Sequence, residues 1–562
     1  MARTVAIGIQ NFEKIRKGNY FYVDKTTFIK EWWESGDEVT LITRPRRFGK
    51  TLNMSMVEQF FSLEYAGRSD LFEGLSIWKE EKYHNLQGTW PVINLSFARV
   101  KENNYCSARN RICEILRNLY IKFSFIRDSS VLTDADRAFY DCMLSLEIDS
   151  DIATSSLYQL SDYLYRYYKK SVIILLDEYD TPMQEAYLYG YWEELVCFMR
   201  NLFNSSFKTN PSLARGLMTG ITRVSRESFF SDLNHLNIIT TTSNQYAATF
   251  GFTEDEVFAA LKEYHLSEKK DEVRFWYNGF TFGKHRDIYN PWSIINYLDQ
   301  QEFDTYWANT SSNSLISRLI QQGSRQLKTS FESLLHGETI SCSIDEQIVF
   351  SQLGNNEISV FSLLLASGHL KIIDRDSSFR SMSRYRTYKV ALTNHEVKLT
   401  FYTMVHEWFE NTGDDYNDFV KALLTGDIKY MNIYMNMITM KTFSYFDIGG
   451  PSSPSAPERF YHGFVLGLLT QLYDRYHVTS NRESGFGRYD VILEPLDKTK
   501  DAIILEFKVK DSEEGSLYAS VQAALQQIEE KQYAADFLAR GFSKNQIKKY
   551  GFAFEGKKVL IG

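Results

Sequence analysis

The chain has 562 residues, a formal net charge of −8 and an apolar fraction of 44%. That length provides for about two to four domains with cores of their own, and that apolar content excludes a disordered chain. The negative net charge excludes a general polyanion-binding protein, so any nucleic-acid surface has to be local.

The five cysteines show no CxxC spacing, which argues against a disulfide framework and against a zinc site. Reduced thiols are typical of a cytoplasmic protein. The N-terminal apolar stretch is too short for a signal peptide, and no apolar run approaches the ~20 residues that a membrane span needs. We therefore expect a cytoplasmic protein with no membrane partner.

Residues 41–51, LITRPRRFGKT, place a short apolar run before an arginine-rich turn and a helix-compatible segment. This layout is typical of a phosphate-binding loop, in which backbone N–H groups at a helix start point at phosphate oxygens. The lysine reaches the outer phosphates and the threonine hydroxyl binds Mg²⁺. Because Arg44 stands where the pattern has a glycine, a basic turn without a ligand stays an alternative. The predicted nucleotide-binding residues are Arg46, Arg47, Phe48, Gly49, Lys50 and Thr51.

Residues 171–180, SVIILLDEYD, predict a buried parallel strand that ends in two carboxylates. Asp177 is expected at the carboxyl edge of the sheet, where ligands bind in open α/β folds, and is a predicted nucleotide-site and Mg²⁺ ligand together with Thr51. Glu178 is predicted to orient and polarise the attacking water. Buried strands often end in acids, but the two motifs in this order favour a nucleotide-hydrolysing core.

Further elements follow along the chain. PVINLSF (91–97) and ARGLMTGIT (214–222) predict two more strands, and residues 104–170 predict helices. The second strand leads to Arg223, whose guanidinium can stabilise charge on a transferring phosphoryl group. An ion pair with Glu227 is the alternative for this arginine.

Three local signals mark the middle of the chain. Thr253 with a glutamate three residues on predicts a capping box, and Asn278-Gly279 predicts a hairpin turn. Asn290 followed by proline predicts the start of a helix. Residues 310–447 are mixed helix and strand without a usable motif.

The segment GGPSSPSAP (449–457) holds three of the nine prolines and predicts a short, semi-rigid linker. A fragment that begins near Ala456 is therefore expected to fold alone, because about 105 residues can carry their own core.

Two predicted strands after this linker, 487–493 and 502–510, are expected to form a hairpin. Glu506 and Lys508 are two residues apart, so they project from one face of their strand, and Asp490 lies on the neighbouring strand. The hairpin can therefore bring all three side chains together.

The chemistry of this group suits a divalent cation. The carboxylates of Asp490 and Glu506 and the backbone carbonyl of Phe507 can hold Mg²⁺ with its waters, and the metal lowers the pKa of a bound water. The lysine positions that water or stabilises the developing charge. An amphipathic hairpin with ordinary surface charges is the alternative. Residues 451–562 contain 15 basic and 15 acidic residues, so they lack the basic footprint of a nonspecific DNA-binding domain.

Four motifs together resemble the AAA-ATPase-like family: YVDKT (22–26), RPRRFGKT (44–51), LLDEYD (175–180) and TGITRVS (219–225). Its members are P-loop proteins usually fused to a C-terminal PD-(D/E)XK nuclease-like domain, and an arginine at the first glycine position is common among them. The resemblance covers most of residues 1–300 and, separately, the C-terminal hundred.

The resemblance also implies roles. The aromatic segment before the loop lies beside the nucleotide, the TGITRVS motif senses the γ-phosphate, and the elements after residue 250 form a helical lid followed by a connecting region. In the nuclease-like domain, the D…ExK residues are catalytic, Gln527, Lys531 and Tyr533 flank the site, and Glu458 adds to the metal shell.

Taken together, the sequence predicts an α/β chain with a P-loop NTPase parallel-sheet domain (1–245), a helical and mixed middle region (246–448), the linker (449–457) and a small α/β PD-(D/E)XK nuclease-like domain (458–562). The expected function is ATP or GTP hydrolysis that controls a Mg²⁺-dependent nuclease acting on DNA or RNA, with nucleotide-dependent homo-oligomerisation. The alternative is a non-catalytic, nucleotide-dependent switch or assembly regulator with an inactive nuclease fold. The predicted catalytic residues are Glu178, Arg223, Asp490, Glu506, Lys508 and Gln527.

Overall fold

The computed structural model describes most of the chain, and its residues divide into two compact units. One unit comprises Met1–Ile316 with Ser341–Val397, and the other Ser317–Ile340 with Lys398–Gly562. The described residues are 2–223, 235–307, 314–335, 337–347, 353, 356–375, 386–410, 416–442, 465, 468–472, 475–480, 483–484, 487–488, 490–510, 515–555 and 558–562. The predicted linker and Glu458 lie outside them.

A parallel sheet forms the centre of the first unit. Its strands are β1 Val39–Thr43, β2 Val92–Ser96, β3 Val172–Asp177, β4 Leu213–Gly220 and β5 Leu236–Ile239. They are ordered β2-β3-β4-β1-β5 and all pair in parallel. Every residue of β3 is buried, as its apolar run predicts for a strand covered on both faces. The expected strands at 91–97, 171–177 and 214–222 are thereby confirmed.

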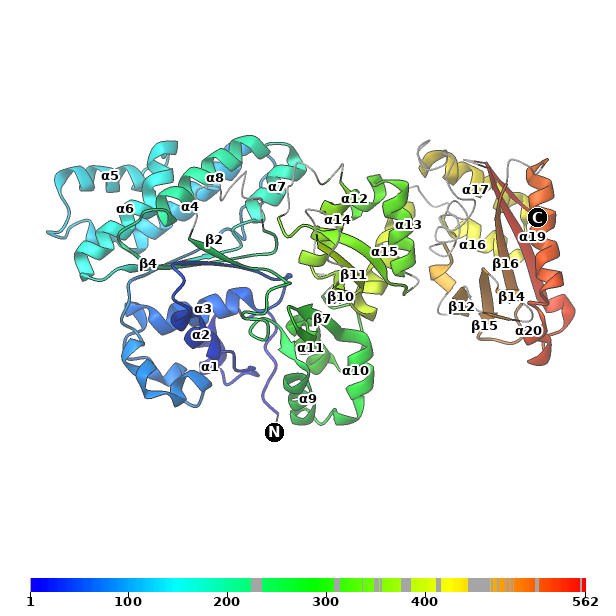
Figure 1. Ribbon diagram of the computed structural model, residues 1–562, viewed down its shortest axis with the longest axis horizontal. Helices are drawn as coiled ribbons and strands as arrows, with labels where there is room; N and C mark the ends of the chain where they lie inside the picture. Colours follow the sequence, from blue (N-terminus) through cyan, green and yellow to red (C-terminus); the bar gives the residue numbers. More distant parts are fainter. Residues whose placement is uncertain are drawn as a thin grey trace. The chain divides into compact units, whose positions relative to one another are not determined.

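Helices cover both faces of this sheet, α1–α3 on one side and α4, α6 and α8 on the other (Figure 1). Their bounds are α1 Phe12–Lys17, α2 Thr27–Ser35, α3 Lys50–Phe61, α4 Tyr105–Lys122, α5 Asp134–Leu144, α6 Ser150–Tyr168, α7 Thr181–Tyr189 and α8 Trp192–Phe207. Leu160, Tyr163 and Leu164 of α6 are buried in the core, whereas Tyr167 on the same helix is exposed.

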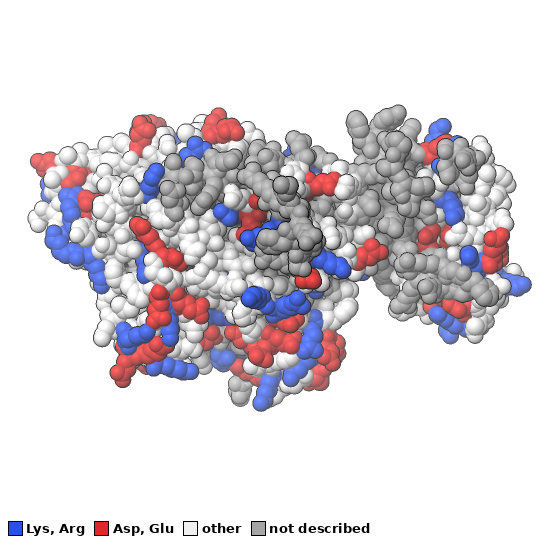
Figure 2. Space-filling model, viewed as in Figure 1, with Lys and Arg blue, Asp and Glu red and all other residues white. Residues whose placement is uncertain are grey.

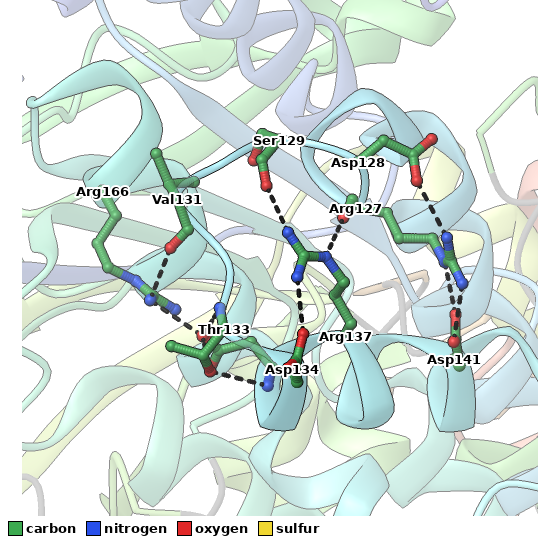
Figure 3. A network of polar contacts seen from close by, with 10 residues as sticks. Arg127, Asp128, Ser129, Val131, Thr133, Asp134, Arg137, Asp141 and Arg166 are labelled. Atoms are coloured by element: carbon green, nitrogen blue, oxygen red, sulfur yellow. Dashed lines mark hydrogen bonds and ion pairs between the residues drawn. The ribbon is translucent and has the colours of Figure 1, made fainter.

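An arginine network fixes the loop between α4 and α5 (Figure 3). Arg127 donates to both carboxylate oxygens of Asp141, at 2.6 and 2.9 Å. Arg137 donates to the carbonyl of Ser129, and Arg166 to the carbonyl of Val131. The loop therefore has side-chain partners on α5 and α6, which lowers its freedom to move.

The rest of the first unit contains two small sheets, ordered β6-β8-β7 and β10-β11-β9. Thr253 caps α9 through the predicted capping box, and Asn290 caps α11 with Pro291 at its first position, as predicted. The elements are β6 Phe252–Thr253, α9 Glu254–Glu263, α10 Lys270–Tyr277, β7 Asn278–Phe282, β8 His285–Tyr289, α11 Pro291–Gln300, β9 Ile340–Ile344, α14 Glu357–Ala366, β10 Leu370–Arg375 and β11 Arg386–Leu392.

The predicted turn at Asn278-Gly279 is wrong, because both residues belong to β7. The turn lies at the other end of β7, between β7 and β8, where Gly283 has φ +57°. Gly279 is needed for another reason: a Cβ there would collide with the carbonyl oxygen of Thr393. An Asn-Gly pair marks a hairpin only when no tertiary contact requires the glycine elsewhere.

The second unit contains a mixed sheet ordered β12-β15-β16-β17-β18, in which β16 and β17 are parallel and the other pairs antiparallel. Helix α19 packs on β16 and β17. The elements are α12 Ser314–Gln322, α13 Arg325–Leu335, α15 His395–Glu410, α16 Tyr416–Thr425, α17 Ile428–Thr442, β12 Tyr476–Ser480, β13 Glu483–Ser484, β14 Gly487–Arg488, β15 Val491–Pro495, β16 Ala502–Val509, α19 Leu517–Glu530, α20 Ala535–Ala539, β17 Ile547–Glu555 and β18 Lys558–Ile561.

Helices α16 and α17 belong to the same hydrophobic core as this sheet. Phe419 and Tyr434 are buried in one cluster with Leu505 and Phe552. The side-chain amide of Asn436 also exchanges two hydrogen bonds with the backbone of β18. The C-terminal core therefore begins well before the predicted linker. None of the helices that the structure describes has the length and apolar character to cross a membrane.

Candidate functional sites

The loop between β1 and α3 lines a cavity of about 340 Å³ in the first unit. Arg47 has φ +65° and Gly49 has φ +78°, and Gly49 is the N-cap of α3. These left-handed residues turn the chain sharply into the helix, so that the first turn of α3 lines the cavity. A helix N-terminus with unpaired N–H groups is a site for an anion.

Lys50, the first residue of α3, is almost fully buried beside this cavity. Its ammonium donates to the carbonyls of Arg44 and Pro45, at 3.0 and 2.8 Å. Burial lowers the pKa of Lys50. An ammonium has three donors, and the described acceptors account for two. The third, together with the low-dielectric surroundings, fits an anionic ligand such as a phosphate.

Thr51 and Asp177 meet across the edge of the sheet. The Thr51 hydroxyl donates to Asp177 Oδ2 at 2.7 Å, and the Thr219 hydroxyl donates to the other carboxylate oxygen. Burial raises the pKa of Asp177. A hydroxyl and a carboxylate are oxygen ligands of the kind that Mg²⁺ prefers, so this pair fits the predicted ion.

Glu178 follows Asp177 and lines the same cavity. It has φ +52°, a backbone conformation that is uncommon for a residue with a side chain. Its carboxylate accepts a hydrogen bond from the Thr181 hydroxyl at 3.1 Å. A backbone held in a costly conformation at a cavity wall is typical of a functional residue.

Arg44, at the position of the first glycine of the motif, turns its side chain into the core. The guanidinium donates to the carbonyls of Thr43 and Thr240, at 2.9 and 2.7 Å, and lies 4.6 Å over the Phe282 ring. Burial lowers the pKa of Arg44 to about 9. The loop tolerates this arginine because its side chain leaves the cavity and ties the loop to the strand end after β5.

The second site lies on the hairpin of β15 and β16. Val491 pairs with Leu505, so Asp490 lies immediately before the paired residues, next to Glu506. The carboxylate of Asp490 accepts a hydrogen bond from the Phe507 N–H at 2.8 Å. Glu506 is 2% exposed and accepts a hydrogen bond from the Gln527 amide of α19. The structure therefore brings the two predicted acids and Gln527 together.

Tyr533 completes this group, because Gln527 also donates to its hydroxyl at 3.4 Å. Burial raises the pKa of Tyr533. Within the described residues, no three His, Cys, Asp or Glu side chains form a metal-binding cluster. A divalent cation here would therefore bind two carboxylates, the Phe507 carbonyl and water, a donor set that suits Mg²⁺.

Comparisons with known proteins identify two family matches, one in each part of the chain that holds a candidate site. Residues 6–230 match the family described as Predicted AAA-ATPase, and residues 456–562 match the PD-(D/E)XK nuclease superfamily. The chain thus joins an AAA-ATPase-like domain to a PD-(D/E)XK nuclease superfamily domain. It is also 25% identical to an uncharacterized protein in the vnfD 5′ region of Azotobacter chroococcum mcd 1, over 98% of this chain and 99% of that one.

Arg223, a predicted catalytic residue of the AAA-ATPase-like domain, lines a separate small cavity with Thr43, Thr240 and Glu346. It is not among the residues that line the cavity at the β1–α3 loop. Glu227, its alternative partner, lies outside the described residues. Its role at the γ-phosphate stays a prediction.

Asp180 was not predicted from the sequence, yet it joins two motifs of the AAA-ATPase-like domain. It is fully buried, and its Oδ2 accepts from the N–H and hydroxyl of Thr222, at 2.8 and 2.7 Å. Burial raises the pKa of Asp180. The third acid of LLDEYD therefore fixes the end of β4 to the end of β3, next to Asp177. The position of Asp180 in the LLDEYD motif was the sequence signal that could have indicated this role.

The cavity of the AAA-ATPase-like domain also has walls that the sequence did not indicate. Trp292 of α11 lines it, and the Arg47 guanidinium lies 4.2 Å over the indole ring. Phe48 also lines this cavity, and its ring packs against Phe280 and Phe282. Asn290, the N-cap of α11, donates a hydrogen bond to the carbonyl of Arg46, which lies 244 residues earlier in the chain. No local sequence pattern could show that this helix packs beside the loop.

Proposed function

We propose that the AAA-ATPase-like domain binds and hydrolyses ATP or GTP with Mg²⁺, and that its nucleotide state controls a Mg²⁺-dependent phosphodiesterase in the C-terminal domain. The observation that carries the proposal is that Lys50, Thr51 and Glu178 line one cavity, and that Thr51 is hydrogen-bonded to the buried Asp177 behind it. Each of these groups has a defined task in phosphoryl transfer.

In this proposal the Lys50 ammonium leaves the loop carbonyls and binds the outer phosphates. Thr51 and Asp177 would hold Mg²⁺, which when bound neutralises charge on the phosphate oxygens. Glu178 accepts a proton from the attacking water, and its backbone conformation holds the carboxylate at the cavity wall.

In the nuclease domain, Asp490 and Glu506 would hold a cation whose chemistry is to lower the pKa of a bound water. Gln527 fixes the rotamer of Glu506, and Lys508 lies two residues further on the same strand, from which it orients the attacking water. On the face drawn in Figure 2, basic and acidic side chains are interspersed over the described surface. Nucleic acid would therefore be held by local contacts at the site.

The test is a cleavage assay on plasmid, linear and single-stranded DNA and on RNA, with Mg²⁺, Mn²⁺ or EDTA, with and without ATP. We expect cleavage of at least one substrate that needs the metal, that changes in rate with ATP, and that is lost in Lys508→Ala. Nucleotide turnover without any cleavage would refute the phosphodiesterase and favour the alternative function, a nucleotide-dependent regulator with an inactive nuclease fold. An ATP-independent rate would refute nucleotide control.

A further inference from the structure

The backbone of the β1–α3 loop is held by residues outside the stretch that matches the AAA-ATPase family. The carbonyl of Arg46 accepts two hydrogen bonds, from Asn290 Nδ2 at 3.3 Å and from Trp307 Nε1 at 3.0 Å. Trp307 is 1% exposed and lies 261 residues after Arg46. The loop thus has an anchor that its own sequence does not contain.

Trp307 is itself fixed by a buried carboxylate. Its backbone N–H donates to Glu396 Oε1 at 2.6 Å, and the Ser293 hydroxyl donates to Glu396 Oε2 at 2.8 Å. Glu396 is fully buried near the start of α15, in the first three residues of that helix, which belong to the first unit. Because Ser293 lies in the first turn of α11, Glu396 holds both the helix that Asn290 caps and the tryptophan.

A second contact supports the same part of the loop. Gly368, with φ +88°, packs against Pro45 so closely that a Cβ there would lie 2.8 Å from Pro45 Cγ. The Thr393 hydroxyl donates to the carbonyl of Gly368 at 2.7 Å. The His369 ring also lies 5.2 Å from the Trp307 ring. Gly368 therefore supports the loop at Pro45, with Thr393 hydrogen-bonded to Gly368 and the His369 ring beside Trp307.

From these contacts we infer that Trp307 and Glu396 are positioning residues of the nucleotide site, which couple the β1–α3 loop to the described residues of 290–307 and 386–396 in the same unit. This inference rests on the proposed nucleotide function. It adds a set of contacts through which the nucleotide state of the loop can affect residues outside the stretch 6–230 that matches the AAA-ATPase-like family. The physical link is Lys50, whose ammonium binds the carbonyls of Arg44 and Pro45. The next carbonyl, that of Arg46, is the one that Trp307 holds.

When a phosphate draws the Lys50 ammonium away from these carbonyls, the Trp307 and Asn290 hydrogen bonds remain to keep the loop in shape. If the Trp307 indole N–H is removed, the Arg46 carbonyl loses a donor and the loop becomes more mobile. Nucleotide binding then has to order the loop, which lowers the affinity. A net hydrogen bond contributes about 1 kcal/mol, which corresponds to an affinity loss of about fivefold.

The first test compares ATP binding by calorimetry in the full chain and in Trp307→Phe, which keeps a ring but removes the N–H donor. We expect the dissociation constant to rise about fivefold. Trp276→Phe is the matched control, because the Trp276 ring stacks on Phe303 in the core around α10 and α11; we expect it to bind ATP like wild type. Equal affinity in wild type and Trp307→Phe would overturn the inference.

A second measurement reports on the tryptophan itself. In protein labelled with 5-fluorotryptophan, the ¹⁹F resonance of Trp307 is identified as the one that is absent in Trp307→Phe. The chemical shift of this resonance should change when ATP is added, and that of Trp276 should not. A purely structural Trp307 would give no shift, and that result would contradict the coupling.

Glu396 supplies a second pair of variants, which serves if Trp307→Phe does not fold. Glu396→Ala removes both acceptors and should weaken ATP binding, whereas Glu396→Gln keeps an oxygen for the Trp307 N–H and should restore most of the affinity. Equal affinity of both with wild type would refute the role of Glu396. If wild type itself binds no ATP, the proposed function fails; if it binds ATP and the variants do so equally, only this inference fails.

Discussion

Two buried cations in the β1–α3 loop differ in what stabilises them. Arg44 has carbonyl acceptors and an aromatic ring around its guanidinium, so its charge is satisfied within the protein. Lys50 has two carbonyl acceptors and a flexible stem that faces the cavity, so it can exchange them for a ligand. The first cation therefore supports the loop, and the second is suited to bind phosphate.

Lys50→Ala should weaken ATP binding about 100-fold or more, because charge-assisted hydrogen bonds to phosphate are lost in a dry site. Isothermal calorimetry with ATP and Mg²⁺ measures this. Lys79→Ala serves as a control, since Lys79 is exposed and does not line this cavity. Unchanged affinity in Lys50→Ala would show that the loop does not bind phosphate.

Glu178→Gln should keep ATP affinity while turnover falls about 10²- to 10⁴-fold, the usual effect of losing a general base. The substitution preserves size and the Thr181 hydrogen bond. Phosphate release measured beside ATP affinity separates the two effects. Turnover at the wild-type rate would remove Glu178 from the mechanism.

Lys25 of the YVDKT motif forms an ion pair that the sequence did not indicate, in which the lysine is buried and the glutamate partly exposed. Its ammonium binds both carboxylate oxygens of Glu256 at 2.7 Å, and burial lowers the pKa of Lys25. Lys25→Met leaves the carboxylate without its cation and should lower the free energy of unfolding by about 2 kcal/mol, less than the loss for a fully buried pair. Denaturant unfolding of Lys25→Met beside the surface variant Lys30→Met tests this; equal effects would contradict it.

At the scale of elements, β16 shows how one strand serves both packing and chemistry. Its first six residues are buried, including Glu506, and burial decreases only at Lys508 and beyond. The strand is central in its sheet, between β15 and β17. Glu506 is therefore held rigidly by the sheet and by Gln527, whereas Lys508 lies where the strand reaches solvent.

Asp490→Ala and Glu506→Ala should each abolish most Mn²⁺ binding in calorimetry, because either change leaves too few oxygen ligands for a hard cation. Lys508→Ala should still bind Mn²⁺ while cleavage falls. Asp497→Ala is the matched control, since Asp497 lies in the exposed turn between β15 and β16. Carboxylate variants that bind metal like wild type would show that the hairpin holds no cation.

At the scale of the whole molecule, the C-terminal domain extends further upstream than residues 456–562, the stretch that matches the nuclease superfamily. Helices α16 and α17 bury apolar side chains in the core of its sheet. Asn432 and Asn436 of α17 also donate hydrogen bonds to the backbone carbonyls of β18. The expected start of an independently folding fragment therefore moves from Ala456 to before α16.

A fragment of residues 411–562 should unfold cooperatively, and one of residues 456–562 should be unstable. The shorter fragment loses seven buried side chains, and four large ones among them, at about 2 kcal/mol each, already equal the whole stability of many small domains. Those four side chains are Phe419, Leu423, Met431 and Tyr434. Amide NMR spectra and thermal unfolding of both fragments decide this. Well-dispersed amide signals from the shorter fragment would restore the boundary at the linker.

The sequence by itself determined the features that depend on neighbouring residues. The buried run of β3, the helix start at Lys50, the capping box at Thr253 and the N-cap at Asn290 all follow from local spacing, because their hydrogen bonds and apolar contacts close within a few residues. The pairing of Asp490 with Glu506 also followed, since a short hairpin fixes its own register.

Only the tertiary structure decided the features that join distant parts of the chain. The inward turn of Arg44, the anchor of Arg46 by Trp307, the displacement of the hairpin turn by the packing of Gly279 and the inclusion of α16 and α17 in the C-terminal core all depend on such contacts. Their partners lie roughly a hundred residues or more away in sequence. No periodicity or motif encodes such pairs, because the free energy of burial depends on which surfaces meet and not on their order in the chain.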